Sequence, residues 1–323
     1  MTEHAIAAPA SAATAQTSRS EVVGFLILTA FVIAAPAFIY PVLMMKILCF
    51  ALFACAFNLL IGYVGLLSFG HALYFGWASY VAAYAAKAWG FTPELAILAG
   101  TLTGAVLGLV AGAIAIRRQG IYFAMITLAL AQMMYFFALQ APFTGGEDGI
   151  QAVPRNRLFG LIDINNPVGM YTLVAVVFLA GFLLIYRIIN SPFGEVLKAI
   201  RENEARAISL GYKTERYKLL AFVLSAALAG TAGATKALVV QLASLTDVHW
   251  SMSGEVVLMT LVGGLGTIFG PVVGAFVIIY MQNALAEFGQ WVTIIQGAIF
   301  VVCVLLFRRG IVGELAGLLR IRL

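Results

Sequence analysis

The amino-acid sequence predicts an all-α, polytopic membrane protein with about ten transmembrane helices. Of its 323 residues, 63% are hydrophobic and only 10% are charged, and the mean hydropathy is +1.01. Soluble domains contain roughly 45–50% apolar residues. Apolar runs of about 18 residues or more, long enough to cross a bilayer, recur along the chain. One integral membrane domain therefore accounts for most of the sequence.

Residues 1–20 precede the first long apolar run and are rich in alanine, serine and threonine. They predict a disordered cytoplasmic tail, because the run after them is too long for the core of a cleaved signal peptide. The transmembrane domain is expected over residues 21–310, and a second cytoplasmic tail over residues 311–323. Apolar periodicity gives the expected helices as 22–40, 42–61, 71–88, 94–115, 120–141, 169–186, 218–243, 252–264, 271–285 and 291–307.

The distribution of basic residues predicts that both termini are cytoplasmic, since Lys and Arg collect in cytoplasmic loops. The segment 252–264 is the weakest of the ten, and a re-entrant segment is the alternative there. A re-entrant segment would place Arg308 outside, whereas basic residues collect on the cytoplasmic side. Ten spans are therefore favoured. With ten spans, 14 of the 19 basic residues lie inside: Arg19, Arg117, Arg118, the seven from Arg187 to Lys218, Arg308, Arg309, Arg320 and Arg322.

Several function classes are not indicated by the sequence. Cys49, Cys55 and Cys303 lie in apolar runs without CxxC spacing, which argues against a disulfide framework or a metal site. The net charge of +5 is spread over loops and forms no nucleic-acid-binding face. No catalytic residues are predicted, because neither a Ser-His-Asp nor an HExxH pattern occurs. No lysine follows a glycine, so the chain has no phosphate-binding loop, and ATP with Mg²⁺ would have to be bound by other subunits.

The stretch SPFGEVLKAIRENEARAISLG (191–211), within the cytoplasmic loop 187–217, predicts one amphipathic helix. Ser191 is the expected cap, Pro192 the first helical residue and Gly211 the stop. Apolar residues recur along one face, and the charges lie opposite them. A basic polar face is typical of helices on anionic lipid, whereas acids and bases are balanced here. This favours a rigid helix that docks on a cytoplasmic protein, with a membrane-surface helix as the alternative. Its candidate contact residues are Glu195, Lys198, Arg201, Glu202, Glu204, Arg206 and Gly211.

The outer loop 142–168 contains TGGEDGI, in which glycines allow tight turns around Glu147 and Asp148. Together with Gly145 and Gly146, these carboxylates form a candidate docking surface for an extracytoplasmic protein with basic groups. A plain solvated turn is the alternative.

Polar residues inside the apolar segments are candidates for a translocation pathway. Asn58, Ser68 and His71 flank the glycine cluster GYVGLLSFGHA (62–72), which is faintly repeated by GGLGTIFGPVVGA (263–275). Hydrogen bonds between helices would explain these polar groups equally well. The chain offers two further pathway candidates, Lys236 and Glu255, at about the same outer level. The two side chains could pair with each other, but a lysine near a helix end that reaches toward the membrane surface is the favoured interpretation.

The motifs also occur in the order found in a known family. They are FNLLIGYVGLLSFGHALYFGWASYVAA (57–83), GIYFAMITLALAQ (120–132), TGGEDGI (144–150), the 191–211 stretch, YKLLAFVLSAALAGTAGA (217–234) and GGLGTIFGPVVGA (263–275). This order resembles the permease subunits of branched-chain amino acid ABC transporters, specifically the longer of the two paired permeases. Glu204 and Ala205, followed by Gly211, resemble the Glu-Ala-Ala…Gly signature of importer permeases, although Arg206 replaces the second alanine and the glycine lies one residue further on.

The resemblance implies a multi-pass subunit of the bacterial inner membrane that imports branched-chain amino acids. Its implied partners are a second permease subunit in a heterodimer, two cytoplasmic ATPases that bind ATP and Mg²⁺, a periplasmic solute-binding protein and the lipid bilayer. The 191–211 stretch would be the coupling helix that docks on an ATPase. Within ABC transport, urea or short amides are the alternative substrates. An ion-coupled secondary transporter is the alternative from another class.

Overall fold

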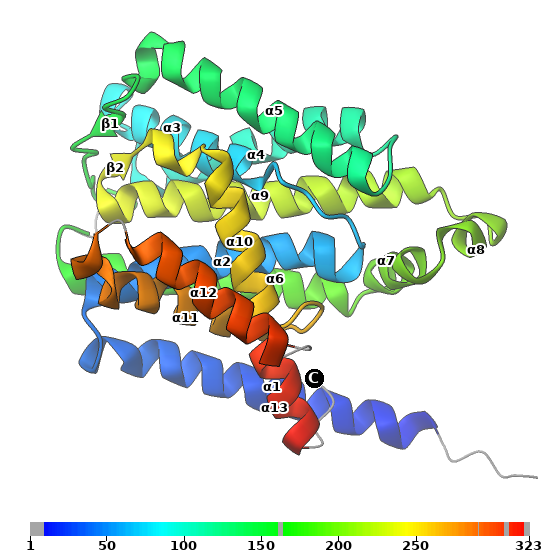
Figure 1. Ribbon diagram of the computed structural model, residues 1–323. Coiled ribbons are helices and arrows are strands. Elements are labelled where there is room, and N and C mark those ends of the chain that lie inside the picture. Colours follow the sequence, from blue (N-terminus) through cyan, green and yellow to red (C-terminus); the bar gives the residue numbers. More distant parts are fainter. Residues whose placement is uncertain (1–9, 161–163, 290, 307–309, 320–323) are drawn as a thin grey trace, which may run out of the picture.

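A computed structural model describes residues 10–160, 164–289, 291–306 and 310–319, and most of them are helical (Figure 1). Two-residue strands β1 (Ile150–Gln151) and β2 (Leu242–Ala243) pair antiparallel. The α-helices are α1 (Ala10–Ala34), α2 (Pro41–Tyr63), α3 (His71–Ala88), α4 (Pro93–Ala115), α5 (Ile121–Gln140), α6 (Pro167–Ile189), α7 (Pro192–Glu202), α8 (Glu204–Ser209), α9 (Thr214–Val240), α10 (Trp250–Gly263), α11 (Gly270–Ala284), α12 (Trp291–Leu306) and α13 (Gly310–Leu319). Short 3₁₀ helices are η1 (Ala35–Ala37), η2 (Pro142–Thr144), η3 (Leu245–Asp247) and η4 (Ala286–Phe288).

Every one of the ten predicted segments contains a helix. Among the described residues, five helices are long and apolar enough to cross a membrane, namely α2, α4, α5, α6 and α9. Helices α10 and α11 are shorter, with 14 and 15 residues. The all-α membrane class is therefore confirmed, while the count of ten spans and the side of the membrane on which each terminus lies remain predictions.

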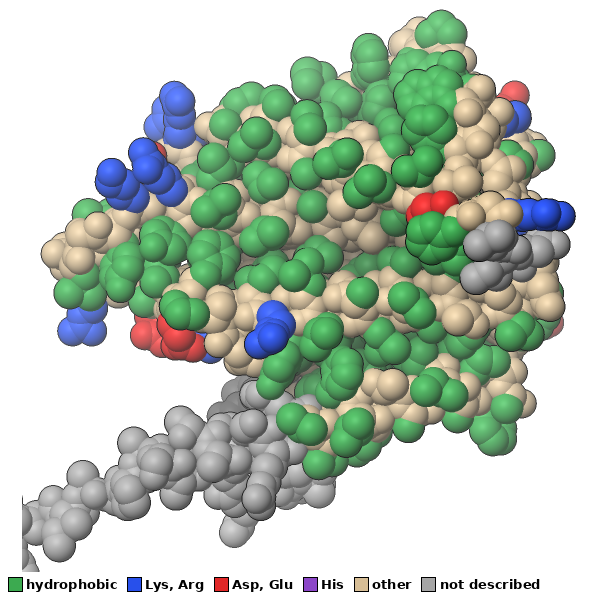
Figure 2. Space-filling view, turned by 180° about the vertical axis from the view of Figure 1, so that it is seen from behind, with side chains coloured by type: hydrophobic (Ala, Val, Ile, Leu, Met, Phe, Trp, Pro, Cys, Tyr) green, Lys and Arg blue, Asp and Glu red, His purple; other side chains and the backbone are tan. Residues whose placement is uncertain are grey.

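Helices α2 and α9 form the centre of the bundle (Figure 1). The most apolar part of α2 is 89% buried, because α6, α9, α10 and α11 surround it. Helices α4, α5 and α6 are apolar too, but much of their surface faces outward. Figure 2 shows this flank covered largely by hydrophobic side chains. Such a surface is stable against lipid or another membrane subunit, but not against water.

Helices α4 and α9 approach closely because small residues line both of them. A Cβ atom added to Gly104 would lie 2.6 Å from the carbonyl oxygen of Ala226 and 3.1 Å from the Cα atom of Gly230. Small residues four apart allow this kind of backbone contact between membrane helices. The glycine content of α4 therefore determines how the two helices pack.

The tail predictions differ from the structure. Helix α1 begins at Ala10, so residues 10–20 are helical where disorder is predicted, and residues 1–9 lie outside the described part. The alanine-rich composition of this segment favours helix once an apolar helix follows it, because alanine has the highest helix propensity. At the other terminus, residues 310–319 form α13, which contacts α10 and α11, and Val312 is buried.

The bundle has two distinct ends, which we call the α7/α8 end and the β1/β2 end after the elements they carry (Figure 1). Figure 2 shows most of the visible Lys and Arg side chains toward these ends. At the β1/β2 end, Arg155 donates hydrogen bonds to the carbonyl oxygens of Leu238 and Val239 in the last turn of α9. These carbonyls have no partner within the helix. Arg155 therefore anchors the predicted outer loop to the end of α9.

Candidate functional site

The predicted single helix over 191–211 is wrong, because the structure divides it at Asn203. Its N-terminus forms as expected: Ser191 accepts a hydrogen bond from the backbone N–H of Gly194. Asn203 then takes an extended conformation, and its side chain accepts a hydrogen bond from the N–H of Arg206, 3.0 Å away. Asparagine competes with the helical backbone in this way and so starts a second helix. The helix pair α7–α8 therefore projects from the bundle as two short helices (Figure 1).

Two of the predicted contact residues turn toward the protein itself. The guanidinium of Arg201 donates a hydrogen bond to the carbonyl oxygen of Gly62, at the end of α2. Glu204 forms a 2.6 Å ion pair with buried Lys218 on α9 and accepts a hydrogen bond from Gln119, 2.7 Å away. The helix pair is therefore fixed to α2, to α9 and to the connection before α5.

The other predicted contact residues lie on the outer surface of the helix pair. Glu195 forms an exposed 2.9 Å ion pair with Lys198. Glu202 and Arg206 are exposed, and the break at Asn203 lies between them. Gly211 ends α8 with φ of 90°, as predicted for the stop.

An apolar patch lies next to these charged residues. It was not among the predicted contact residues, which were chosen from the charge pattern. Ile208, Leu210 and Tyr212 are 56%, 70% and 40% exposed around the end of α8. Three large apolar side chains at the tip of a projecting helix pair are suited to burial against another protein. A signal was present in the sequence, since Leu210 and Tyr212 flank the predicted stop at Gly211.

The two glycine clusters come together in space at the inner side of the helix pair. Asn58 on α2 donates a hydrogen bond to the carbonyl of Thr267, 2.9 Å away, and accepts one from the N–H of Gly266, 3.0 Å away. A Cβ atom on Gly62 would lie 2.9 Å from the nitrogen of Gly266, so the two backbones are in direct contact. The loop after α2 and the loop between α10 and α11 therefore meet, and Asn58 joins them.

Of the other two polar candidates near the first glycine cluster, His71 forms an interhelical contact and Ser68 forms a contact within its own loop. Buried His71 shares a 2.9 Å hydrogen bond between its Nε2 atom and the hydroxyl of Ser225 on α9, and Ser225 donates to the carbonyl of Ala56 on α2. Ser68 is buried and accepts a hydrogen bond from the N–H of Gly70. The alternative of structural hydrogen bonding thus describes both residues in this state of the protein.

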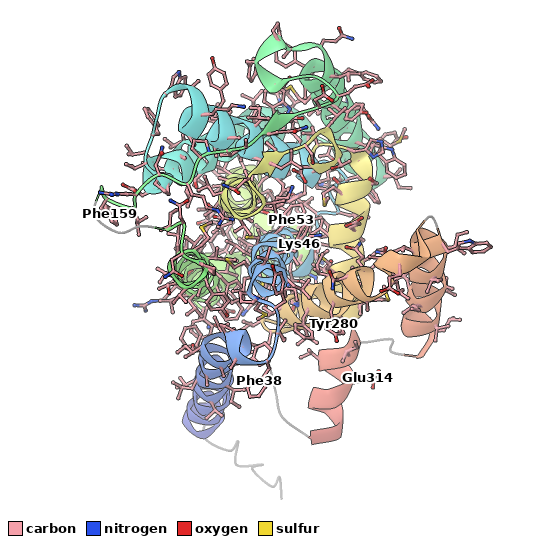
Figure 3. All side chains as sticks on the ribbon, turned by 90° about the vertical axis from the view of Figure 1, so that its left-hand side faces the viewer. Phe38, Lys46, Phe53, Phe159, Tyr280 and Glu314 are labelled. Carbon is pink, nitrogen blue, oxygen red and sulfur yellow. The ribbon has the colours of Figure 1, made fainter. Side chains whose placement is uncertain are left out.

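The charged candidates within the bundle are not paired with each other. Lys236 forms a buried ion pair with Asp247 of η3, with Nζ–O distances of 2.6 and 2.8 Å, and not with Glu255. Glu255 is half-buried on α10, and its side chain lies near Gln282 on α11. Lys46 on α2, which was not among the predicted site residues, lies near the middle of the bundle when viewed from the β1/β2 end (Figure 3).

The predicted docking loop lies at the β1/β2 end. Gly145, Gly146 and Gly149 have φ values of 78°, 59° and 68°, which glycine adopts readily. Glu147 and Asp148 are exposed on the turn that these glycines form. Among the described residues, neither carboxylate takes part in an ion pair. Strand β1 follows directly and ties this turn to β2.

Comparisons with known proteins place the chain among membrane permeases. The sequence model of the family described as "Branched-chain amino acid transport system / permease component" matches residues 40–306. The permease protein LivM of the high-affinity branched-chain amino acid transport system of Escherichia coli K12 is 26% identical over 277 residues, which are 79% of this chain and 65% of that protein. This chain therefore spans about 65% of the length of the LivM relatives that it matches.

Other relatives match a smaller share of this chain, and their printed names specify either branched-chain amino acids or sugars. A probable branched-chain amino acid transport permease protein, LivH, of Methanocaldococcus jannaschii is 26% identical over 62% of this chain and 65% of its own length. The ribose import permease protein RbsC of Escherichia coli K12 is 27% identical over 60% of this chain and 62% of its own length. No solved structure matches this chain. Since the family model covers most of the sequence and its helical bundle, the chain belongs to the family of branched-chain amino acid transport system permease components.

Proposed function

We propose that this chain is the permease subunit of an ATP-driven importer for branched-chain, aliphatic amino acids. The observation that carries the proposal is the family match over residues 40–306, together with relatives whose printed names specify branched-chain amino acids. The described residues contain no group of three or more metal-ligating side chains, which fits a transport subunit as well as it fits many other proteins. The proposed location is the bacterial inner membrane.

The partners in this proposal are a second permease, two cytoplasmic ATPases and a periplasmic solute-binding protein. The helix pair α7–α8 would receive an ATPase, with Ile208, Leu210 and Tyr212 buried in the contact and Glu202 and Arg206 at its edge. Interfaces of this kind have an apolar centre and a polar rim. The loop with Glu147 and Asp148 would receive the binding protein at the opposite end. ATP and Mg²⁺ would be bound by the ATPases.

The contacts of Arg201 suggest how a movement of the ATPase would reach the pathway. Arg201 joins α7 to Gly62, and Asn58, one helical turn before Gly62, joins α2 to the loop at Gly266 and Thr267. Both glycine loops would then move with the helix pair. Rearrangement of packed helices and loops that have two discrete arrangements is a common basis for switching transitions.

The proposal is tested by reconstituting the chain with its candidate partners in proteoliposomes and measuring uptake of radiolabelled leucine. ATP-dependent, binding-protein-dependent uptake is the expected result. Leucine uptake driven by an ion gradient with this chain alone would instead indicate a secondary transporter.

Because ribose and arabinose permeases also match, the same vesicles are offered labelled ribose and arabinose. Labelled urea and acetamide test the remaining alternative. ATP-dependent uptake of one of these in place of leucine would replace the proposed substrate and leave the permease assignment intact.

A further inference from the structure

Four ionisable side chains lie inside the bundle toward the β1/β2 end. They are Lys46 on α2, Lys236 on α9, Asp247 in η3 and Glu255 on α10. Lys236 and Asp247 neutralise each other in a buried ion pair. Among the described residues, neither Lys46 nor Glu255 has an oppositely charged group within 4.0 Å. The Lys46 ammonium and the Glu255 carboxylate are nevertheless close enough to attract each other electrostatically. Ionisable groups inside a membrane bundle are costly, and they commonly mark the path of a substrate.

The surroundings of Lys46 and Glu255 hold both side chains in place without neutralising them. The Nζ atom of Lys46 lies 5.9 Å from the centroid of the Phe50 ring, an arrangement in which an aromatic face attracts a cation. The side chain of Gln282 on α11 lies near Glu255, and its Nε2 atom lies 3.4 Å from the Oε1 atom of buried Gln296 on α12. Helices α2 and α10 contact each other, and both charged side chains are only half-buried. The cation and the anion therefore lie on neighbouring helices, and each keeps part of its side chain exposed.

A cation and an anion on neighbouring helices that do not form an ion pair with each other suit a ligand that carries both charges. A free amino acid is a zwitterion in which the ammonium and the carboxylate are attached to one carbon atom, so it can span two charges that are too far apart to form their own ion pair. Charge-assisted hydrogen bonds to such groups are about twice as strong as neutral ones. A sugar or an amide has no charged pair to satisfy Lys46 and Glu255 together. The chemistry of the pair thus selects amino acids among the substrates of related permeases.

We propose that Lys46 and Glu255 form a transient binding site for the zwitterionic head group of the transported amino acid, with Lys46 at the carboxylate and Glu255 at the ammonium. Gln282 lies near Glu255, and the Lys236–Asp247 ion pair is near enough for its charges to act on Lys46. The inference rests on the proposed function and adds to it the residues that recognise the substrate within the membrane.

The test is a competition assay on the purified permease complex without its binding protein. Displacement of radiolabelled leucine is measured with leucine itself, with leucinamide, which lacks the carboxylate, and with 4-methylpentanoate, which lacks the ammonium. Leucine should displace the label at least tenfold better than either analogue. In Lys46→Met the preference for leucine over leucinamide should largely disappear, and in Glu255→Gln the preference over 4-methylpentanoate should largely disappear. Lys46→Arg and Glu255→Asp, which keep the charges, should retain a preference.

A matched control is Lys87→Met, which removes an exposed lysine at the same end of the protein, where it donates a hydrogen bond to the carbonyl of Gln151. This variant should keep both preferences. If the wild-type complex transports leucine but binds none in this assay, or if the preferences survive in Lys46→Met and Glu255→Gln, the head-group site is overturned while the proposed function stands. If the wild-type complex transports no leucine, the proposed function itself fails.

Discussion

Arg201 on α7 donates a hydrogen bond to the backbone carbonyl of Gly62, and this contact joins the projecting helix pair to the end of the most buried helix, α2. Because Asn58 binds the second glycine loop one turn earlier, three segments that are far apart in the sequence meet at this point. The structure thus brings Arg201, a predicted contact residue for a partner protein, close to Asn58, a predicted residue of the translocation pathway.

Arg201→Ala should uncouple ATP hydrolysis from transport in the reconstituted complex. The variant removes the link between α7 and Gly62 and leaves the outer surface of the helix pair unchanged. Leucine uptake should fall about tenfold or more, which corresponds to the loss of roughly 1.4 kcal/mol of coupling, while ATPase activity and subunit assembly are retained. Arg117→Ala, a change at the same end but outside the helix pair, is the control. Normal uptake by Arg201→Ala would contradict the proposed route.

Leu210→Asp should weaken binding of the ATPases. Leu210 is 70% exposed at the tip of the helix pair, so the change does not disturb the core, but it places a carboxylate in the expected apolar contact. Co-purification of the ATPases with the permease should drop at least tenfold, with the thermal stability of the permease unchanged. Leu265→Asp, which changes a partly exposed leucine in the α10–α11 loop, is the comparison. If co-purification is undiminished, the ATPases bind elsewhere on the protein.

Asn58→Leu should loosen the junction between the two glycine loops. The substitution keeps the branched shape of the side chain, with a larger volume, but removes both hydrogen bonds to Gly266 and Thr267. Leaving these partly buried groups unpaired should lower the free energy of unfolding by about 1 kcal/mol or more. Thermal denaturation in detergent measures the effect, and Asn283→Leu on an exposed face of α11 serves as the control. Equal stability of the two variants would show that the junction is unimportant for the fold.

Gly104→Ala should destabilise the contact between α4 and α9. Its new Cβ atom would meet the carbonyl of Ala226 at 2.6 Å, so the helices must move apart. Overpacking of this kind costs about 1–3 kcal/mol. Gly254→Ala is the matched control, because nothing lies within 4 Å of the position of its Cβ atom. That variant should be neutral or slightly stabilising, since alanine favours helix. A loss of stability in both variants alike would refute the argument from close approach.

Lys236→Met and Asp247→Asn should each destabilise the protein more than the combined variant Lys236→Met/Asp247→Leu. Removing one partner of a buried ion pair leaves an uncompensated charge and costs about 3–5 kcal/mol, whereas replacing both with apolar residues is often tolerated. Unfolding midpoints in detergent measure the three variants. Additive losses in the combined variant would show that the two charges act independently.

Local patterns made much of the fold predictable. Length and uniform apolarity identify α2, α4, α5, α6 and α9 as membrane-spanning candidates, because a helix in lipid must satisfy its own backbone and present apolar side chains. Ser191, Pro192 and Gly211 mark the ends of the 191–211 segment, because caps and stops act within a few residues. These features depend only on neighbours in the chain, and the structure confirms them.

The sequence by itself determined the membrane class, the approximate positions of the ten apolar helices and the family, since each of these follows from short-range patterns. Only the tertiary structure decided that Lys236 pairs with Asp247 rather than Glu255, and that Arg201 reaches Gly62. The physical reason is that such pairings depend on which helices pack side by side. Several partners of the right charge were available along the chain, and only packing between the helices brought one of them within hydrogen-bonding distance.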